Sequence, residues 1–196
     1  MSVLDANIKT SKCEKQFFQT LPEQVDALCA FLLKSHFHKD ISILDVGSGK
    51  GRIKEGLICN GFNNVKTNDL YFDSDFKGDF LKYDFNEVTE FNLVVSNPPY
   101  LSRDKQKYQF IDKALEISVN AIFLFPLQML NYIYFCENYL DTNKYRGRLT
   151  LYPKVILNSE GKLIQGGNTG YGWFWFSRDR YGEKFEEFVD TRKYRK

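Results

Sequence analysis

The segment Asn97-Pro98-Pro99-Tyr100 combines residue types that could prepare an amine for reaction. Proline fixes φ and lacks an N–H group, so two prolines stiffen the chain and leave its carbonyl groups free to face a ligand. The side-chain oxygen of Asn97 and the carbonyl of Pro98 can then accept hydrogen bonds from one NH2 group. Tyr100 offers a ring on which a planar substrate can stack. The motif also fits a plain turn at the end of a strand, but its residue types favour chemistry at an amine.

A glycine-rich loop, D-V-G-S-G-K-G at residues 45–51, lies between a predicted strand and a predicted helix. Gly47, Gly49 and Gly51 have no Cβ, so the backbone can approach a ligand and present the helix N-terminus to it. The phosphate-binding pattern G-x-x-x-x-G-K-[ST] is absent, because glycine follows Lys50 where Ser or Thr is required. The loop therefore indicates a nucleotide-type ligand, but neither a kinase nor an ATPase.

Two acidic residues follow at positions that suit the same ligand. Asp69 ends the next predicted strand, where acidic residues of doubly wound nucleotide sites accept hydrogen bonds from both ribose hydroxyls. Asp79 could accept a hydrogen bond from an exocyclic amine, and the ring of Phe80 after it could cover a purine. The plainer alternatives are an Asn-Asp turn at Asp69 and a solvated acid beside a core ring at Asp79.

The hydrophobic pattern predicts the elements that position these residues. Helical spacing predicts helices at residues 21–34, after the glycine loop, at 107–118 and at 127–140. Apolar runs predict strands at residues 41–46, 63–70, 91–96, 121–126, 148–157 and 171–177, with a loop at 158–170. The alternation of strands and helices predicts an α/β protein with a Rossmann-like doubly wound sheet, mostly parallel, with helices on both faces. The last two strands are expected to form an antiparallel hairpin at its C-terminal edge.

Together these motifs resemble class I S-adenosylmethionine-dependent amino-methyltransferases with an N-P-P-Y motif, over about residues 17–176. The resemblance is strongest to DNA adenine N6 methyltransferases, including small phage-type enzymes. It implies that S-adenosylmethionine is the cofactor and that the target amine is held by Asn97, Pro98, Pro99 and Tyr100. It also implies contacts of the cofactor with the residues Asp45, Gly47, Gly49 and Gly51 (methionine part), Asp69 (ribose), Asp79 and Phe80 (adenine), and Asn97.

Two further segments carry the resemblance. The segment F-F-Q-T-L-P at residues 17–22 is similar to the aromatic-x-Thr-Pro segment that closes over the cofactor in such enzymes, and this similarity implies roles for Phe18 and Thr20. An extra Leu separates Thr20 from the proline, so the match is imperfect. The strand Y-G-W-F-W-F-S at residues 171–177 is similar to a late aromatic strand of the phage-type members. Its side chains alternate, so one face is expected in the core and the other could stack with a flipped base.

The motif does not name the molecule that carries the amine. Adenine in DNA is the preferred target; adenine N6 in RNA, glutamine N5 in protein and a catalytically silent scaffold are the alternatives. Arg103, Lys105 and Lys107 follow Tyr100 and could contact phosphates, as could the basic tail at residues 192–196. Nucleic acid, DNA rather than RNA, is therefore the expected partner. Another protein or a second copy of the chain could supply target recognition.

Composition sets the remaining expectations. A chain of 196 residues with 43% hydrophobic content suits one catalytic domain at residues 1–196, without a separate target-recognition domain. A net charge of +2 is too small to identify a nucleic-acid binder by itself. The sequence contains neither a long apolar run nor a signal peptide, so an intracellular, soluble protein of the cytoplasm or host-cell interior is expected. The scattered cysteines and histidines predict no metal site.

Overall fold

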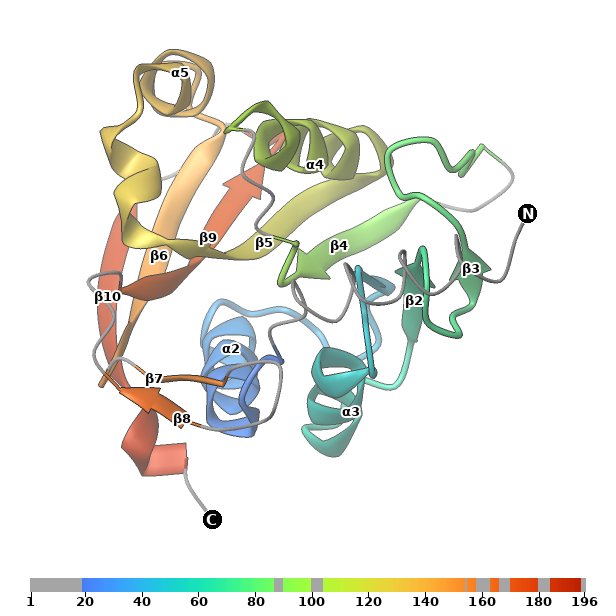
Figure 1. The fold of residues 1–196 in the computed structure, drawn as a ribbon, viewed down its shortest axis with the longest axis horizontal. Helices are drawn as coiled ribbons and strands as arrows, with labels where there is room; N and C mark the ends of the chain where they lie inside the picture. The colour runs from blue at the N-terminus through green and yellow to red at the C-terminus, as the bar shows by residue number, and fades with distance from the viewer. Residues whose placement is uncertain are drawn as a thin grey trace, which may run out of the picture.

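The computed structural model describes residues 19–86, 90–99, 104–153, 155–157, 163–165, 170–179 and 184–194. Its eight-stranded sheet has the order β10-β6-β9-β5-β4-β1-β2-β3 (Figure 1). Strands β3, β2, β1, β4 and β5 are parallel, whereas β9 is antiparallel to both β5 and β6. The bounds are β1 Ile43–Val46, β2 Val65–Asp69, β3 Phe76–Lys77, β4 Phe91–Ser96, β5 Ser118–Pro126, β6 Tyr145–Tyr152, β9 Tyr171–Ser177 and β10 Phe185–Asp190. The predicted fold class is confirmed.

Helices cover both faces of this sheet (Figure 1). The helices α2 (Pro22–Lys34) and α3 (Arg52–Cys59) pack against one face, and α4 (Asp104–Ile117) and α5 (Ile133–Phe135) lie on the other. Helix α2 begins with a proline in its first turn, and the Gln24 side chain accepts a hydrogen bond from the Leu21 N–H at 2.9 Å. Three short helical turns are also present. The turns η1 (Leu127–Asn131) and η2 (Cys136–Leu140) flank α5, and η3 (Thr191–Tyr194) follows β10.

Three predicted elements differ from the structure. The strand predicted at 148–157 is broken, because Pro153 has no N–H for the sheet; β6 ends before it and β7 (Val155–Leu157) begins after it. Within the predicted loop 158–170, β8 (Leu163–Gln165) pairs antiparallel with β7. The helix predicted at 127–140 is split into η1, α5 and η2. The sequence reading also missed β10, which pairs parallel with β6 and extends the sheet beyond the β6–β9 pair.

Both faces of the aromatic strand β9 pack against other elements, with only Trp175 and Tyr171 half-buried, so neither face is open for stacking with a flipped base. Phe174 and Phe176 are fully buried among the rings beneath α5 and η2. On the other face Trp173 is 1% exposed and donates its indole N–H to the Gln24 carbonyl at 2.9 Å. Trp175 donates to Asn120 at 2.9 Å and packs against Phe31. These rings stabilise the core of the sheet.

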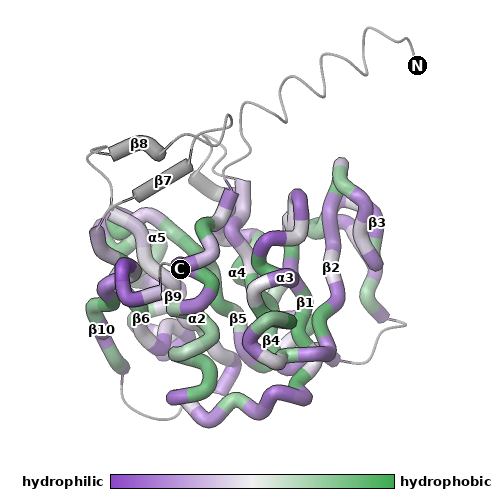
Figure 2. Tube along the Cα trace, turned by 90° about the horizontal axis from the view of Figure 1, so that it is seen from below, coloured by the Kyte–Doolittle hydropathy of each residue, from purple (hydrophilic) through white to green (hydrophobic). Residues whose placement is uncertain are grey.

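The distribution of hydropathy follows these layers. Hydrophobic positions gather along α2 and the central strands, whereas the region of β2 and β3 is more hydrophilic (Figure 2). Among the described residues, no helix is both long enough and apolar enough to cross a membrane.

Candidate active site

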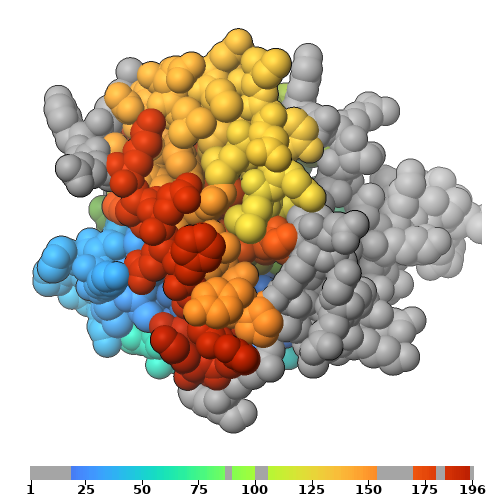
Figure 3. All heavy atoms as spheres, turned by 90° about the vertical axis from the view of Figure 1, so that its left-hand side faces the viewer, coloured from blue at the N-terminus to red at the C-terminus, as the bar shows by residue number. Residues whose placement is uncertain are grey.

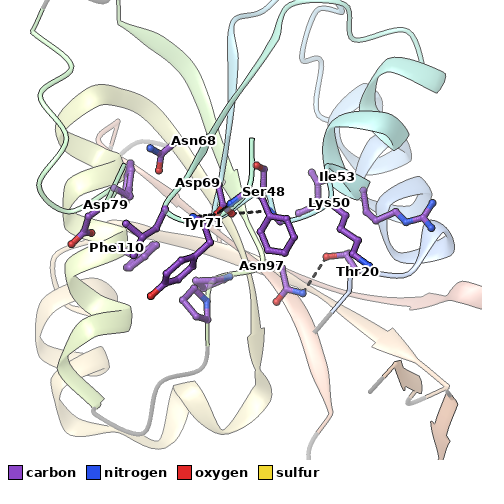
Figure 4. A pocket seen from close by; sticks show the side chains of 18 of the residues that line it. Thr20, Ser48, Lys50, Ile53, Asn68, Asp69, Tyr71, Asp79, Asn97 and Phe110 are labelled. Carbon is purple, nitrogen blue, oxygen red and sulfur yellow. Dashed lines mark hydrogen bonds between the residues drawn. The ribbon is translucent and has the colours of Figure 1, made fainter. Parts of the chain in front are cut away.

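A cavity of about 420 Å³ opens where the parallel strands β1, β2 and β4 end. Ligands of open α/β sheets bind at this edge, where loops leave the carboxyl ends of the strands. Figure 4 shows its side chains converging from the glycine loop, the end of β2 and the end of β4. The described residues that line it are Gln19, Thr20, Gly47, Ser48, Gly49, Lys50, Arg52, Ile53, Asn68, Asp69, Leu70, Tyr71, Phe72, Gly78, Asp79, Phe80, Asn97, Pro98, Pro99, Gln106 and Phe110.

The glycine loop forms one wall through its backbone. Gly49 and Gly51 have φ values of 54° and 78°, in the left-handed region that glycine adopts without strain. Gly47 also has a positive φ, and a Cβ placed there would lie 3.9 Å from Cδ of Pro99. The glycine loop and the N-P-P-Y motif are therefore neighbours across the cavity edge.

Asp69 organises the loops around the cavity. Its Oδ2 accepts a hydrogen bond from the Gly49 N–H at 2.8 Å, which joins the end of β2 to the glycine loop. Its Oδ1 accepts the N–H groups of Tyr71 and Phe72 at 2.7 and 2.8 Å. A carboxylate oxygen has two lone pairs, so Oδ2 keeps one acceptor position and the two sites of Oδ1 are used. In this arrangement Asp69 could accept from one ribose hydroxyl, whereas contact with both would require a loop N–H to move.

Asn68 holds the segment that carries Asp79. Its Nδ2 donates to the carbonyl groups of Phe76 and Gly78 at 2.6 and 3.1 Å, and the side chain is 1% exposed. Asp79 accepts the Leu81 N–H at 3.1 Å and lies at the cavity, partly exposed. Phe80 lines the cavity but is 3% exposed and packs against Phe110. Most of the Phe80 ring therefore belongs to the core.

Asn97 lies at the end of β4, opposite the glycine loop. The Ser96 hydroxyl donates to the Val46 carbonyl at 2.5 Å and so ties the ends of β4 and β1 together. The Asn97 Nδ2 donates to Oγ1 of Thr20 at 3.1 Å, a contact that Figure 4 marks with a dashed line. Thr20 is 5% exposed, so this contact is shielded from solvent. The side-chain acceptor that an amine would meet is therefore Oδ1 of Asn97.

Asp45 lies behind the glycine loop, outside the set of described residues that line the cavity. It is 0% exposed, and its Oδ2 accepts the Lys54 N–H at 3.2 Å. Burial raises the pKa of the carboxyl group to about 8, although the hydrogen bond from Lys54 acts in the opposite direction. The position of Asp45 indicates support of the loop from beneath.

The cavity brings together many of the residues expected from the sequence. It includes Thr20, Gly47, Gly49, Asp69, Asp79, Phe80, Asn97, Pro98 and Pro99. Asp45, Gly51 and Lys107 are not among its described lining residues. Phe18, Tyr100, Arg103 and the side chain of Lys105 lie outside the described residues.

The structure also adds residues that sequence reasoning missed. Leu70 and Tyr71 line the cavity and are 48% and 55% exposed, so they could cover the faces of a flat heterocycle. Asn68 and the helix residues Gln106 and Phe110 line it as well. A signal for Leu70 and Tyr71 was present, since two large apolar residues directly follow the strand-end acid.

The parallel sheet, the glycine loop and the strand-end acids define a class I methyltransferase fold. A sequence profile of the Eco57I restriction-modification methylase family matches residues 7–165, and the chain belongs to this family. It is thus an S-adenosylmethionine-dependent methyltransferase of the restriction-modification type. No curated protein matches its sequence.

Solved structures share the fold at low sequence identity. A candidate RNA methyltransferase from Pyrococcus horikoshii has a TM-score of 0.64 at 20% identity, over 84% of this chain and 86% of that chain. A candidate class I S-adenosylmethionine-dependent methyltransferase from Listeria monocytogenes has a TM-score of 0.60 at 16% identity, over 88% and 65%. Magnesium protoporphyrin IX methyltransferase from Synechocystis, solved with bound S-adenosylmethionine, has a TM-score of 0.54 at 12% identity, over 81% and 79%.

S-adenosylmethionine is the cofactor of this class, and the cavity fits it. A volume of about 420 Å³ lies within the usual range for small-molecule and cofactor sites. The glycine loop supplies close backbone contact, Asp69 keeps one acceptor position on Oδ2, and the exposed side chains of Leu70 and Tyr71 offer apolar cover. When bound, the cofactor supplies an electrophilic methyl group on a sulfonium.

Proposed function

We propose that this protein methylates an exocyclic amine, and specifically N6 of adenine in DNA. The observation that carries the proposal is that Asn97, Pro98 and Pro99 line the same cavity as the glycine loop and Asp69. The acceptor atoms for an amine and the wall for a cofactor thus face one space. We further propose that residues 1–196 act as a single catalytic domain.

The roles follow from the chemistry of the side chains. Oδ1 of Asn97 and the carbonyl of Pro98 accept the two N–H groups of the amine, which holds its lone pair toward the methyl group. With the cofactor bound, the amine nitrogen would attack the methyl carbon as the carbon–sulfur bond breaks, S-adenosylhomocysteine would leave as the neutral thioether, and the methylated nitrogen would release one proton to water. Positioning and stabilisation of the developing positive charge by these oxygens supply the rate enhancement. Tyr100, by its place in the motif, is proposed to stack on the adenine once it leaves the helix.

The fold offers a place for target recognition at the same edge. Because β6 runs parallel to β5, its last residue Tyr152 lies at the edge where β4 ends, and β9 starts there at Tyr171. The connection between them therefore leaves and returns at the same edge of the sheet as Asn97, with β5 between β9 and β4. We propose that this connection contacts the nucleic acid.

Labelled methyl transfer to separate DNA, RNA and protein pools tests the proposal. We expect label in DNA, and we expect Asn97→Ala to reduce transfer by about 100-fold or more while its affinity for S-adenosylmethionine stays within about twofold. Ser48→Ala, on the cofactor wall of the cavity, serves as a comparison in which cofactor affinity should change instead. Label found only in RNA or only in protein would refute DNA as the substrate and identify that other pool as the substrate. Wild-type rates in Asn97→Ala would refute the assignment of the motif.

A further inference from the structure

A surface of two tyrosines and an isoleucine, called the aromatic surface below, lies at the start of α5, outside the cavity described above. It consists of Tyr132, Ile133 and Tyr134, which are 41%, 75% and 44% exposed. Three consecutive large apolar residues at the surface are unusual in a soluble chain unless they meet a partner. Figure 3 shows this segment in yellow at the surface, on the face that also carries β10 in red.

The rings of this surface are held by α4. Tyr134 lies 4.4 Å, centroid to centroid, from the ring of Tyr108, which is 4% exposed and also packs against the buried Tyr139. The Lys107 ammonium lies 4.0 Å from the centroid of the Tyr132 ring and 5.1 Å from that of Tyr108. The surface therefore combines fixed rings with a positive charge.

Helix α4 also places this surface next to the active site. Gln106 and Phe110 line the cavity from one side of the helix, and Lys107 lies on the adjacent side. The aromatic surface therefore lies beside the helix that lines the cavity. In addition, α4 follows the N-P-P-Y motif directly along the chain.

We propose that Tyr132, Ile133, Tyr134 and Lys107 bind an unpaired segment of the strand that carries the target base. Exposed rings stack with bases of any sequence, and a cation beside them complements the phosphate backbone. The combination of the Lys107 ammonium with the rings of Tyr132 and Tyr134 favours a polynucleotide over a purely apolar protein partner. The inference rests on the proposed function, because it assumes that the substrate is a nucleic acid.

Binding of a fluorescent single-stranded oligodeoxynucleotide to the full chain, measured by anisotropy at fixed salt, tests this surface. We expect Tyr132→Leu to weaken binding by about tenfold, because a flat ring is lost but the apolar bulk stays, and Tyr132→Trp to bind as tightly as wild type. Lys107→Gln should reduce the slope of log Kd against log salt concentration by about one, because one phosphate contact is lost. Phe188→Ala removes a 68% exposed ring on β10 and should leave binding unchanged.

The controls separate this inference from the proposed function. Thermal unfolding of each variant with and without S-adenosylmethionine verifies that fold and cofactor site are intact. If Tyr132→Leu binds the oligonucleotide like wild type, or if Phe188→Ala weakens binding equally, the surface does not bind nucleic acid. Loss of self-association in Tyr132→Leu with unchanged oligonucleotide binding would assign it to a protein contact. The labelling experiment tests adenine methylation by the wild type independently of this surface.

Discussion

At the residue scale, the contact between Thr20 and Asn97 links the chain before α2 to the proposed catalytic motif. The resemblance to other methyltransferases implied that Thr20 touches the cofactor. In the structure its Oγ1 accepts a hydrogen bond from Nδ2 of Asn97 at 3.1 Å. This geometry points to Thr20 as a positioning residue that fixes the direction of the Asn97 amide.

Replacing Thr20 distinguishes these two roles. Thr20→Val keeps the shape of the side chain and removes the acceptor, so we expect kcat to fall by about tenfold while KM for S-adenosylmethionine stays within about twofold. Thr20→Ser keeps the hydroxyl and should restore most of kcat. A rise in KM for the cofactor with unchanged kcat would show instead that Thr20 acts on the cofactor.

At the residue scale, the sequence predicted contiguous motifs better than contacts between distant segments. The glycine loop, Asp69 and Asn97 could be recognised because each motif lies at the end of a predicted strand. The hydrogen bonds of Asp69 to Gly49 and of Asn97 to Thr20 join segments far apart along the chain, and no local pattern encodes them. The position of Asp45 behind the loop was missed because its burial depends on β1 being covered on both faces.

An ion-pair cluster around Asp75 holds the far end of the loop after β2, whose near end is held by Asp69. Asp75 accepts hydrogen bonds from the N–H and hydroxyl of Thr67, both at 2.9 Å, and pairs with Lys54 and Lys66 at 3.2 Å. Partial burial raises the pKa of its carboxyl group, but the hydrogen bonds from Thr67 and the two lysines outweigh it and lower the pKa to about 2. The cluster fixes one end of the loop after β2 to Thr67, Lys54 and Lys66. The same loop contains Leu70 and Tyr71, which line the cavity.

The cluster gives a pH-dependent prediction. Because the pKa of Asp75 is lower in the folded state than its usual value of 3.8, its stabilisation is present above about pH 4 and is lost as the pH falls toward 2. Asp75→Asn should therefore lower the free energy of unfolding by about 1 kcal/mol at pH 7, after allowance for solvent screening, and by much less at pH 2. Urea unfolding at both pH values measures the difference.

Asp73→Asn is the matched control for this prediction, since Asp73 is an exposed carboxylate on the same loop. It should change stability little at either pH. An equal effect of Asp75→Asn at pH 2 and pH 7 would contradict the role given to the cluster.

At the element scale, the strands β1, β4 and β5 of the central sheet could be predicted because they are rich in consecutive apolar residues. The edge strand β10 was missed because F-E-E-F-V-D has neither a continuous apolar run nor a strict alternation of apolar and charged residues, and Phe188 faces solvent. One face of the aromatic strand β9 could have stacked with a flipped base, but α2 covers one face and α5 with η2 covers the other. Burial of both faces depends on tertiary packing, which alternation along the strand does not reveal.

At the scale of the whole molecule, the glycine loop, the proposed catalytic motif and the ends of the β6–β9 connection lie at one edge of the sheet. Hydrogen bonds of Asp69, Asn68 and Ser96 join the loops and strand ends at that edge. They fix the position of the glycine loop relative to Asn97. A substrate that reaches Asn97 also meets the glycine loop and α4. This arrangement supports methyl transfer to a base within a polynucleotide.

Mass spectrometry of nucleosides from methylated DNA tests the central claim most directly. After incubation with the wild-type protein and S-adenosylmethionine, we expect N6-methyladenine as the methylated nucleoside, and we expect it to be missing after incubation with Asn97→Ala. Methyl groups on a ring carbon, or N6-methyladenine formed equally by Asn97→Ala, would contradict the account of how this site holds its target amine.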